Sequence, residues 1–207
     1  MKYTIVMLID FIGHPSLGDQ YTNDRRYSEL LKFATSKNLD KDNIVFVTNQ
    51  RPGHELPNMR NMYSHKLFEI LSMLYVADYK VIYTHPEESI SNIINKIKDN
   101  KDLKWDIKEY NTQVIIGGCN LGGCVINAKP MSAVFWQLKG YKTTIHLPLC
   151  AEYEQPGTNQ VEKIYRSIEQ LFHFTKEYKA FGIEYCTDFH RLKMTYKGAW
   201  QYWQIMI

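Results

Sequence analysis

The chain has 207 residues and a net charge of +3, from 25 Lys and Arg against 22 Asp and Glu. A charge this close to balance gives no sign of a nucleic-acid or membrane partner, and a hydrophobic content of 44% can support a sizeable core. The four cysteines stand apart, without the paired spacing of a zinc site or a disulfide framework, which predicts reduced thiols in a cytoplasmic protein.

Short apolar strands alternate with amphipathic helices over the first 150 residues. In chain order the predicted elements are a strand over 3–9, a helix from Thr22 or Asn23 to Ala34, a strand over 43–48, a helix over 63–76, a strand over 80–84, a helix over 88–98, a strand over 112–116, a helix over 124–138 and a strand over 142–147. The first strand is too short for a secretory segment or a membrane span. This alternation predicts an α/β fold, a doubly wound and mostly parallel sheet with helices on both faces.

The composition changes after residue 150. We therefore expect an α/β core domain over 1–150, followed over 151–207 by a helix and a strongly aromatic tail. A tail this apolar is expected to pack either on its own core or on a partner subunit.

A glycine-rich loop follows the expected strand over 112–116 and ends at Cys124. Glycines allow a sharp turn and a close approach of the backbone. Cys124 is expected where the next helix begins, and the positive end of a helix dipole favours a reactive thiolate. The alternative is a small buried side chain that fills a tight junction between strand and helix. The loop has neither the dinucleotide nor the P-loop pattern, so no cofactor is expected.

Asp10 ends the first strand. Ligands bind at the carboxyl ends of the strands in open parallel sheets, so Asp10 and Cys124 would face each other if their strands are neighbours. A carboxylate can take the thiol proton and return it to a leaving group, and the amides of Gly123 and Cys124 could stabilise an oxyanion. These parts suit acyl transfer through a thioester. The alternative for Asp10 is a helix cap or a carboxylate bonded to loop amides.

This arrangement resembles the isochorismatase-like cysteine hydrolases, which include the nicotinamidases. The resemblance rests on the first strand ending in Asp10, on Gly118 separated by five residues from Cys124-Val125, and on Gly140-Tyr141 before the next strand. It implies a doubly wound α/β sheet, usually in a homo-oligomer, with Asp10 as the general base and Cys124 as the nucleophile.

The chain departs from the family pattern at two places. The family has a catalytic lysine at the end of the third strand, where this chain has Thr84-His85-Pro86; Lys80 stands at the start of that strand. Lys80 or His85 could supply the third catalytic group, or the group could be missing. The metal-binding Asp-x-His pattern of nicotinamidases is not kept in residues 48–54, so no metal is expected. Pro130 should kink the helix over 124–138 or delay its regular start.

The sequence thus predicts a hydrolase that acts on a small amide or a related acyl compound. The alternative is a protein that has kept the fold but lost catalysis, and that serves as a binding or assembly module.

Overall fold

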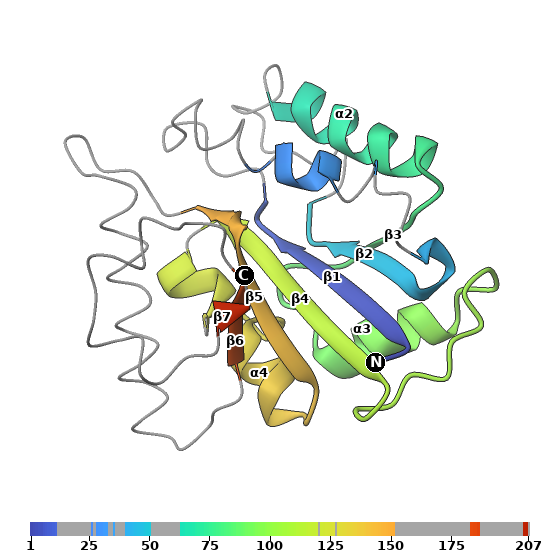
Figure 1. Ribbon diagram of the computed structural model, residues 1–207, viewed down its shortest axis with the longest axis vertical. Coiled ribbons are helices and arrows are strands. Elements are labelled where there is room, and N and C mark those ends of the chain that lie inside the picture. The colour runs from blue at the N-terminus through green and yellow to red at the C-terminus, as the bar shows by residue number, and fades with distance from the viewer. Residues whose placement is uncertain are drawn as a thin grey trace.

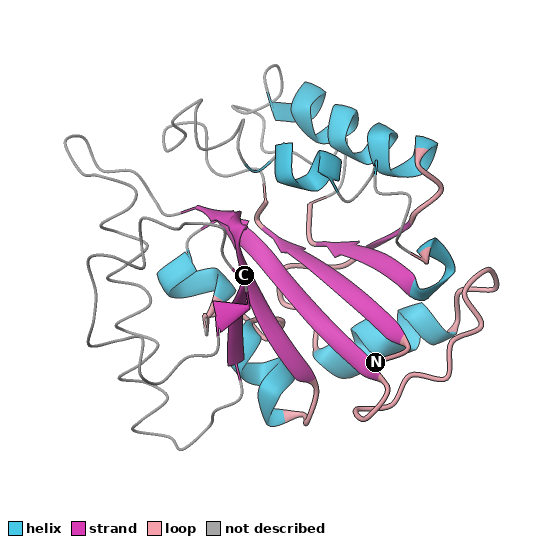
Figure 2. Cartoon of the chain, in the orientation of Figure 1, coloured by secondary structure: helices cyan, strands magenta, loops and turns pink. Residues whose placement is uncertain are grey.

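The computed structural model describes residues 1–11, 26, 28–32, 35, 40–50, 63–119, 121–126, 128–151, 183–186 and 205–206. The strands are β1 (Tyr3–Ile9), β2 (Ile44–Thr48), β3 (Lys80–Tyr83), β4 (Thr112–Cys119), β5 (Lys142–Ala151), β6 (Ile183–Cys186) and β7 (Ile205–Met206). The helices are η2 (Lys41–Asn43), α2 (Tyr63–Val76), α3 (Ile90–Lys98), the π-helix η4 (Leu121–Val125) and α4 (Ala133–Leu138). Figure 2 marks these elements on the chain.

The described strands form one sheet in the order β3-β2-β1-β4-β5-β6-β7, and each neighbouring pair is parallel. The chain runs outward from β1 to β3 and then returns to add β4 on the other side of β1. The strand order therefore reverses between β1 and β4. The predicted α/β fold with a mostly parallel sheet is confirmed.

The alternating side chains of β1 explain why helices cover both faces of the sheet. Ile5 and Met7 pack into a core cluster with residues of α3 and α4. Val6 and Leu8 belong to a second cluster, which includes Leu71 of α2. Accordingly, α2 lies on one side of the sheet and α3 and α4 on the other (Figure 1). Burial on both faces accounts for the continuous apolar run of this strand.

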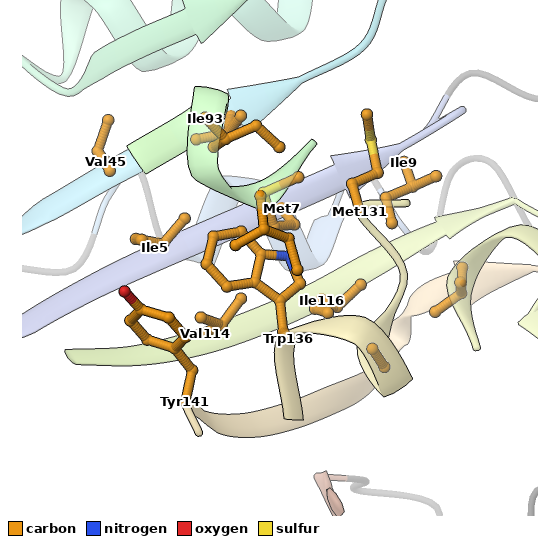
Figure 3. Packing of buried hydrophobic residues seen from close by; sticks show 14 of the residues in the cluster. Ile5, Met7, Ile9, Val45, Ile93, Val114, Ile116, Met131, Trp136 and Tyr141 are labelled. Carbon is orange, nitrogen blue, oxygen red and sulfur yellow. The ribbon is translucent and has the colours of Figure 1, made fainter. Parts of the chain in front are cut away.

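Trp136 of α4 is the largest fully buried side chain of the first cluster. It is fully buried, and its ring meets that of Tyr141 edge to face at 5.2 Å. Figure 3 shows Trp136 lying over β1 and β4, between Met7 and Ile116. This packing fixes α4 against the two strands at which the strand order reverses.

The segment after β4 differs from the helix expected over 124–138. β4 continues to Cys119, the π-helix η4 follows, and regular helix starts only at Ala133, after Ser132. Pro130 lies between the two helices, where it can neither donate a backbone hydrogen bond nor continue a helix. The expected effect of this proline is confirmed as a delayed start.

The glycine pair of β4 serves close backbone packing. A Cβ on Gly118 would lie 1.9 Å from the carbonyl oxygen of Ile9, and one on Gly117 would lie 2.4 Å from the Cβ of Leu149. The β4–β5 pairing shifts register here, from Ile116 opposite Ile145 to Gly118 opposite Cys150. The glycines therefore let β4 lie against β1 on one side and against the bulged end of β5 on the other.

The last strand, β7, pairs with β6 at the edge of the sheet, so this part of the expected tail joins the chain's own sheet. The helix expected after residue 150 and the rest of the tail lie outside the described residues. Among the residues that the structure describes, we find no helix with the length and apolar character needed to cross a membrane.

Candidate active site

Asp10 directly follows β1 at the carboxyl edge of the sheet. The residue before it, Ile9, pairs with Gly118 of β4, and Leu8 pairs with Thr48 of β2. Asp10 has a φ of 44°, a left-handed conformation that is uncommon for a residue with a side chain. The carboxylate thus stands where the strand order reverses, which is the usual ligand position in an open parallel sheet.

Lys129 brings a positive charge to Asp10. Its Nζ lies 2.8 Å from Oδ2 of Asp10 and donates to Oδ1 at 3.0 Å. The side chains are only 17% and 29% exposed, so water and salt screen this pair less than an ion pair on the open surface. The ammonium group straddles both oxygens of the carboxylate.

Asn49 meets Asp10 from the other side, at the end of β2. Its Nδ2 donates to Oδ1 of Asp10 at 2.7 Å, and its Oδ1 accepts from the backbone N–H of Asp10 at 2.8 Å. Asn49 is buried, with 8% of its surface exposed. One amide side chain therefore holds both the backbone and the carboxylate of Asp10.

Cys124 and Lys129 belong to one compact turn. Ser132 ties them together, because its Oγ donates to the Cys124 carbonyl at 2.5 Å and accepts from the Lys129 N–H at 2.9 Å. The N–H of Ala128 also donates to the Gly123 carbonyl at 2.9 Å. Cys124 is half-buried and packs against the core cluster that contains Ile9. The turn that contains the Cys124 sulfur thus also provides the lysine that contacts Asp10.

The structure corrects one premise about Cys124. The residue lies inside the five-residue η4, and the first α-helix after it begins at Ala133. The dipole of a long helix therefore does not act on this sulfur. Cys119, Cys124 and Cys150 each carry a thiol and not a disulfide.

Lys80 lies far from Asp10. It starts β3 and pairs with Val45, which pairs with Ile5, five positions before Asp10. At about 3.3 Å per residue this offset is roughly 16 Å along the strands. Its Nζ lies 3.6 Å from Asp102 at the exposed surface. The structure does not bring Lys80 into the candidate site.

His85 lies past the carboxyl end of β3, which is the correct edge of the sheet but two strands from β1. It is exposed, and its Nδ1 accepts from the N–H of Glu87 at 3.2 Å. The ring thus forms part of its own turn. His14 and His54, which are also near expected strand ends, lie outside the described residues. Within the described part of the chain no three His, Cys, Asp or Glu side chains gather as metal ligands would.

Two residues in the described part of the chain contact the Asp10 carboxylate, and sequence reasoning missed both. Lys129 stood inside the expected helix over 124–138, so nothing marked it as a site residue. Asn49 could have been found from the sequence, because it directly follows the strand over 43–48. Ligands bind at the carboxyl ends of the strands, and this argument, which selected Asp10, applies equally to Asn49.

A second polar contact joins the helical residues between β1 and β2 to β5. Glu29 Oε1 lies 2.7 Å from Nε2 of His146, and Glu29 Oε2 lies 2.7 Å from Nζ of Lys32. These contacts, the hydrogen bond to His146 first, lower the pKa of Glu29 from 4.5 to about 2. The carboxylate helps to hold the helical residues around 30 against the bulged end of β5.

This lowered pKa predicts a loss of stability in acid. A carboxyl group with a depressed folded-state pKa stabilises the fold above its unfolded pKa and loses that contribution as the pH falls through the folded value. We expect Glu29→Gln to lower the free energy of unfolding at neutral pH, and the difference from wild type to shrink between pH 4.5 and about pH 2. Urea denaturation over this range measures it. The exposed Glu87→Gln is the control, and a difference for Glu29→Gln that does not change with pH would contradict the prediction.

No model of a known protein family matches the chain, and no curated protein matches its sequence.

Proposed function

We propose that the protein is a cysteine hydrolase of the isochorismatase-like type, acting on a small amide or a related acyl compound. One observation carries the proposal: the Asp10 carboxylate, at the reversal of strand order, is bound by Lys129 from the turn that contains Cys124. A carboxylate, an ammonium group and a thiol on adjoining segments are the groups that acyl transfer through a thioester needs.

Asp10 is the proton carrier in this proposal. It takes the proton of the Cys124 thiol, and the sulfur forms a bond to the acyl carbon of the substrate. Asp10 then gives the proton to the leaving nitrogen as the C–N bond breaks. In the second half, water attacks the thioester while Asp10 takes its proton, and the released thiolate recovers that proton. The amides of Gly123 and Cys124 are our candidates for holding the oxyanion.

Lys129 takes the place of the lysine that the family resemblance expects at the end of β3. Its ammonium lies against both carboxylate oxygens at 2.8 and 3.0 Å, so it balances the charge of Asp10 next to the reacting centre. Such a fixed positive charge also stabilises the negative charge that develops on the substrate oxygen. In this proposal the catalytic ammonium group therefore comes from the turn after Cys124, which follows β4, and not from the end of β3.

Selective alkylation tests the proposal without knowledge of the substrate. With iodoacetamide at neutral pH, we expect Cys124 to be carboxamidomethylated at least about tenfold faster than Cys119 or Cys150, because an activated thiolate in an accessible site reacts fastest. Mass spectrometry of the cysteine-containing peptides gives the individual rates.

Cys124→Ala is the control that assigns the fast label to this sulfur. Equally slow labelling of Cys119, Cys124 and Cys150 would contradict the hydrolase proposal. It would instead favour the catalytically inactive binding or assembly module.

A further inference from the structure

Asn49 forms a two-point contact with Asp10. The N–H of Asp10 needs an acceptor and its carboxylate needs a donor, so only one orientation of the amide satisfies both: Oδ1 toward the backbone and Nδ2 toward the carboxylate. An aspartate at position 49 could keep the first bond but could not donate the second when ionised. The pair therefore depends on an amide at this position.

The contact also stabilises an unusual backbone conformation. Asp10 has a φ of 44°, and non-glycine residues stay in this region only where their surroundings hold them there. Asn49 accepts from the Asp10 N–H while buried, with 8% exposed. In this conformation the chain turns sharply after Ile9, and the carboxylate meets Lys129.

The hydrogen bonds make the two oxygens of Asp10 unequal. Oδ1 accepts from both Asn49 Nδ2, at 2.7 Å, and Lys129 Nζ, at 3.0 Å. Oδ2 has one contact among the described residues, with Lys129 Nζ at 2.8 Å. A carboxylate oxygen has two lone pairs in the carboxylate plane. Counting the described residues, Oδ1 therefore has a donor for each lone pair, whereas Oδ2 has one lone pair left for a proton.

We infer that Asn49 is a positioning residue, which holds Asp10 in its left-handed conformation and saturates Oδ1, so that Oδ2 exchanges the proton with Cys124. This inference rests on the proposed hydrolase function. Asn49 itself transfers no proton; it selects which oxygen of Asp10 does so.

Two substitutions separate this role from a purely structural one. Asn49→Ala removes both hydrogen bonds and should lower kcat/KM for p-nitrophenyl acetate about ten- to a hundredfold at every pH, mainly through kcat, because the base is misplaced. Asn49→Asp should be impaired near pH 8, where a second carboxylate repels Asp10. It should recover as the pH is lowered, because protonation of the carboxyl group introduced at position 49 restores a hydrogen-bond donor to Oδ1.

The matched control is Asn95→Asp, which makes the same chemical change on an exposed residue of α3 and should follow the wild-type pH profile. The inference is overturned if Asn49→Ala keeps wild-type kcat/KM, or if the ratio of Asn49→Asp to wild type does not change with pH. Should Asn49→Ala fail to fold, the profile of Asn49→Asp decides alone. Failure of both variants to fold would make Asn49 a structural residue and overturn the inference.

The two proposals fail in different ways. Wild-type turnover in Cys124→Ala would remove the hydrolase function itself. Loss of turnover in Cys124→Ala with unaffected Asn49 variants would remove only the role of Asn49.

Discussion

Replacing Lys129 by methionine is expected to lower kcat/KM by about 10²- to 10³-fold, both for p-nitrophenyl acetate and for any small amide that the protein hydrolyses. This is the range seen when one charge-stabilising donor is removed from an active site. Methionine keeps much of the length and apolar volume of the lysine stem but removes the charge. The Asp10 carboxylate would lose its contacts at 2.8 and 3.0 Å. The effect should therefore appear in turnover and leave the circular dichroism spectrum unchanged.

Lys80→Met is the matched control. Lys80 is also a lysine near a carboxylate, but it lies at the amino end of β3, away from the carboxyl ends of the strands where Asp10 stands. This substitution should leave turnover unchanged, and Cys124→Ala should define the background rate. A larger loss for Lys80→Met than for Lys129→Met would return the third catalytic role to β3 and contradict our assignment.

Gly118→Ala is expected to cost about 3 kcal/mol or more of the free energy of unfolding, at the upper end for an overpacked core position. The new Cβ would stand 1.9 Å from the Ile9 carbonyl oxygen and 2.8 Å from its carbonyl carbon. Both atoms belong to the β1 backbone, which cannot turn aside as a flexible side chain could. Relief would require β1 and β4 to separate next to Asp10, so activity should fall together with stability. Urea denaturation measures the loss.

Gly140→Ala provides the comparison for Gly118→Ala. Gly140 has a φ of 88°, but its nearest contact to a new Cβ would be a Glu109 side-chain atom at 3.5 Å. Only backbone strain is then added, which costs about 1 kcal/mol. A loss for Gly118→Ala no greater than that for Gly140→Ala would show that β1 and β4 separate easily.

The order of strands and helices could be predicted because it depends on local patterns. The apolar run ending at Asp10 and the alternating patterns of the later strands gave the α/β class correctly. The delayed start of the helix could also be predicted from Pro130, since the effect of a proline on a helix is local. The strand order, by contrast, depends on which segments pair across the chain, and periodicity does not encode this.

The contacts of Asp10 could not be predicted for the same reason. Lys129 is 119 residues from Asp10 and Asn49 is 39 residues away. Lys129 reaches Asp10 only because the segment after β4 forms a π-helix and a turn in place of a continuous α-helix. Lys80 was attractive in the sequence because it is near the expected position. The register of β3 places it about one strand length from the site.

The central position of β1 has a consequence for folding. Thr4 on β1 lies beside Gln113 on β4, 109 residues later in the chain. During synthesis, one hydrogen-bonding edge of β1 must therefore wait while more than a hundred further residues are made, whereas β2 can cover the other edge much earlier. Long-range pairing of this kind is slow and leaves an apolar strand edge open to other chains. The strand that carries the proposed base therefore has one edge open to wrong partners until β4 has been made.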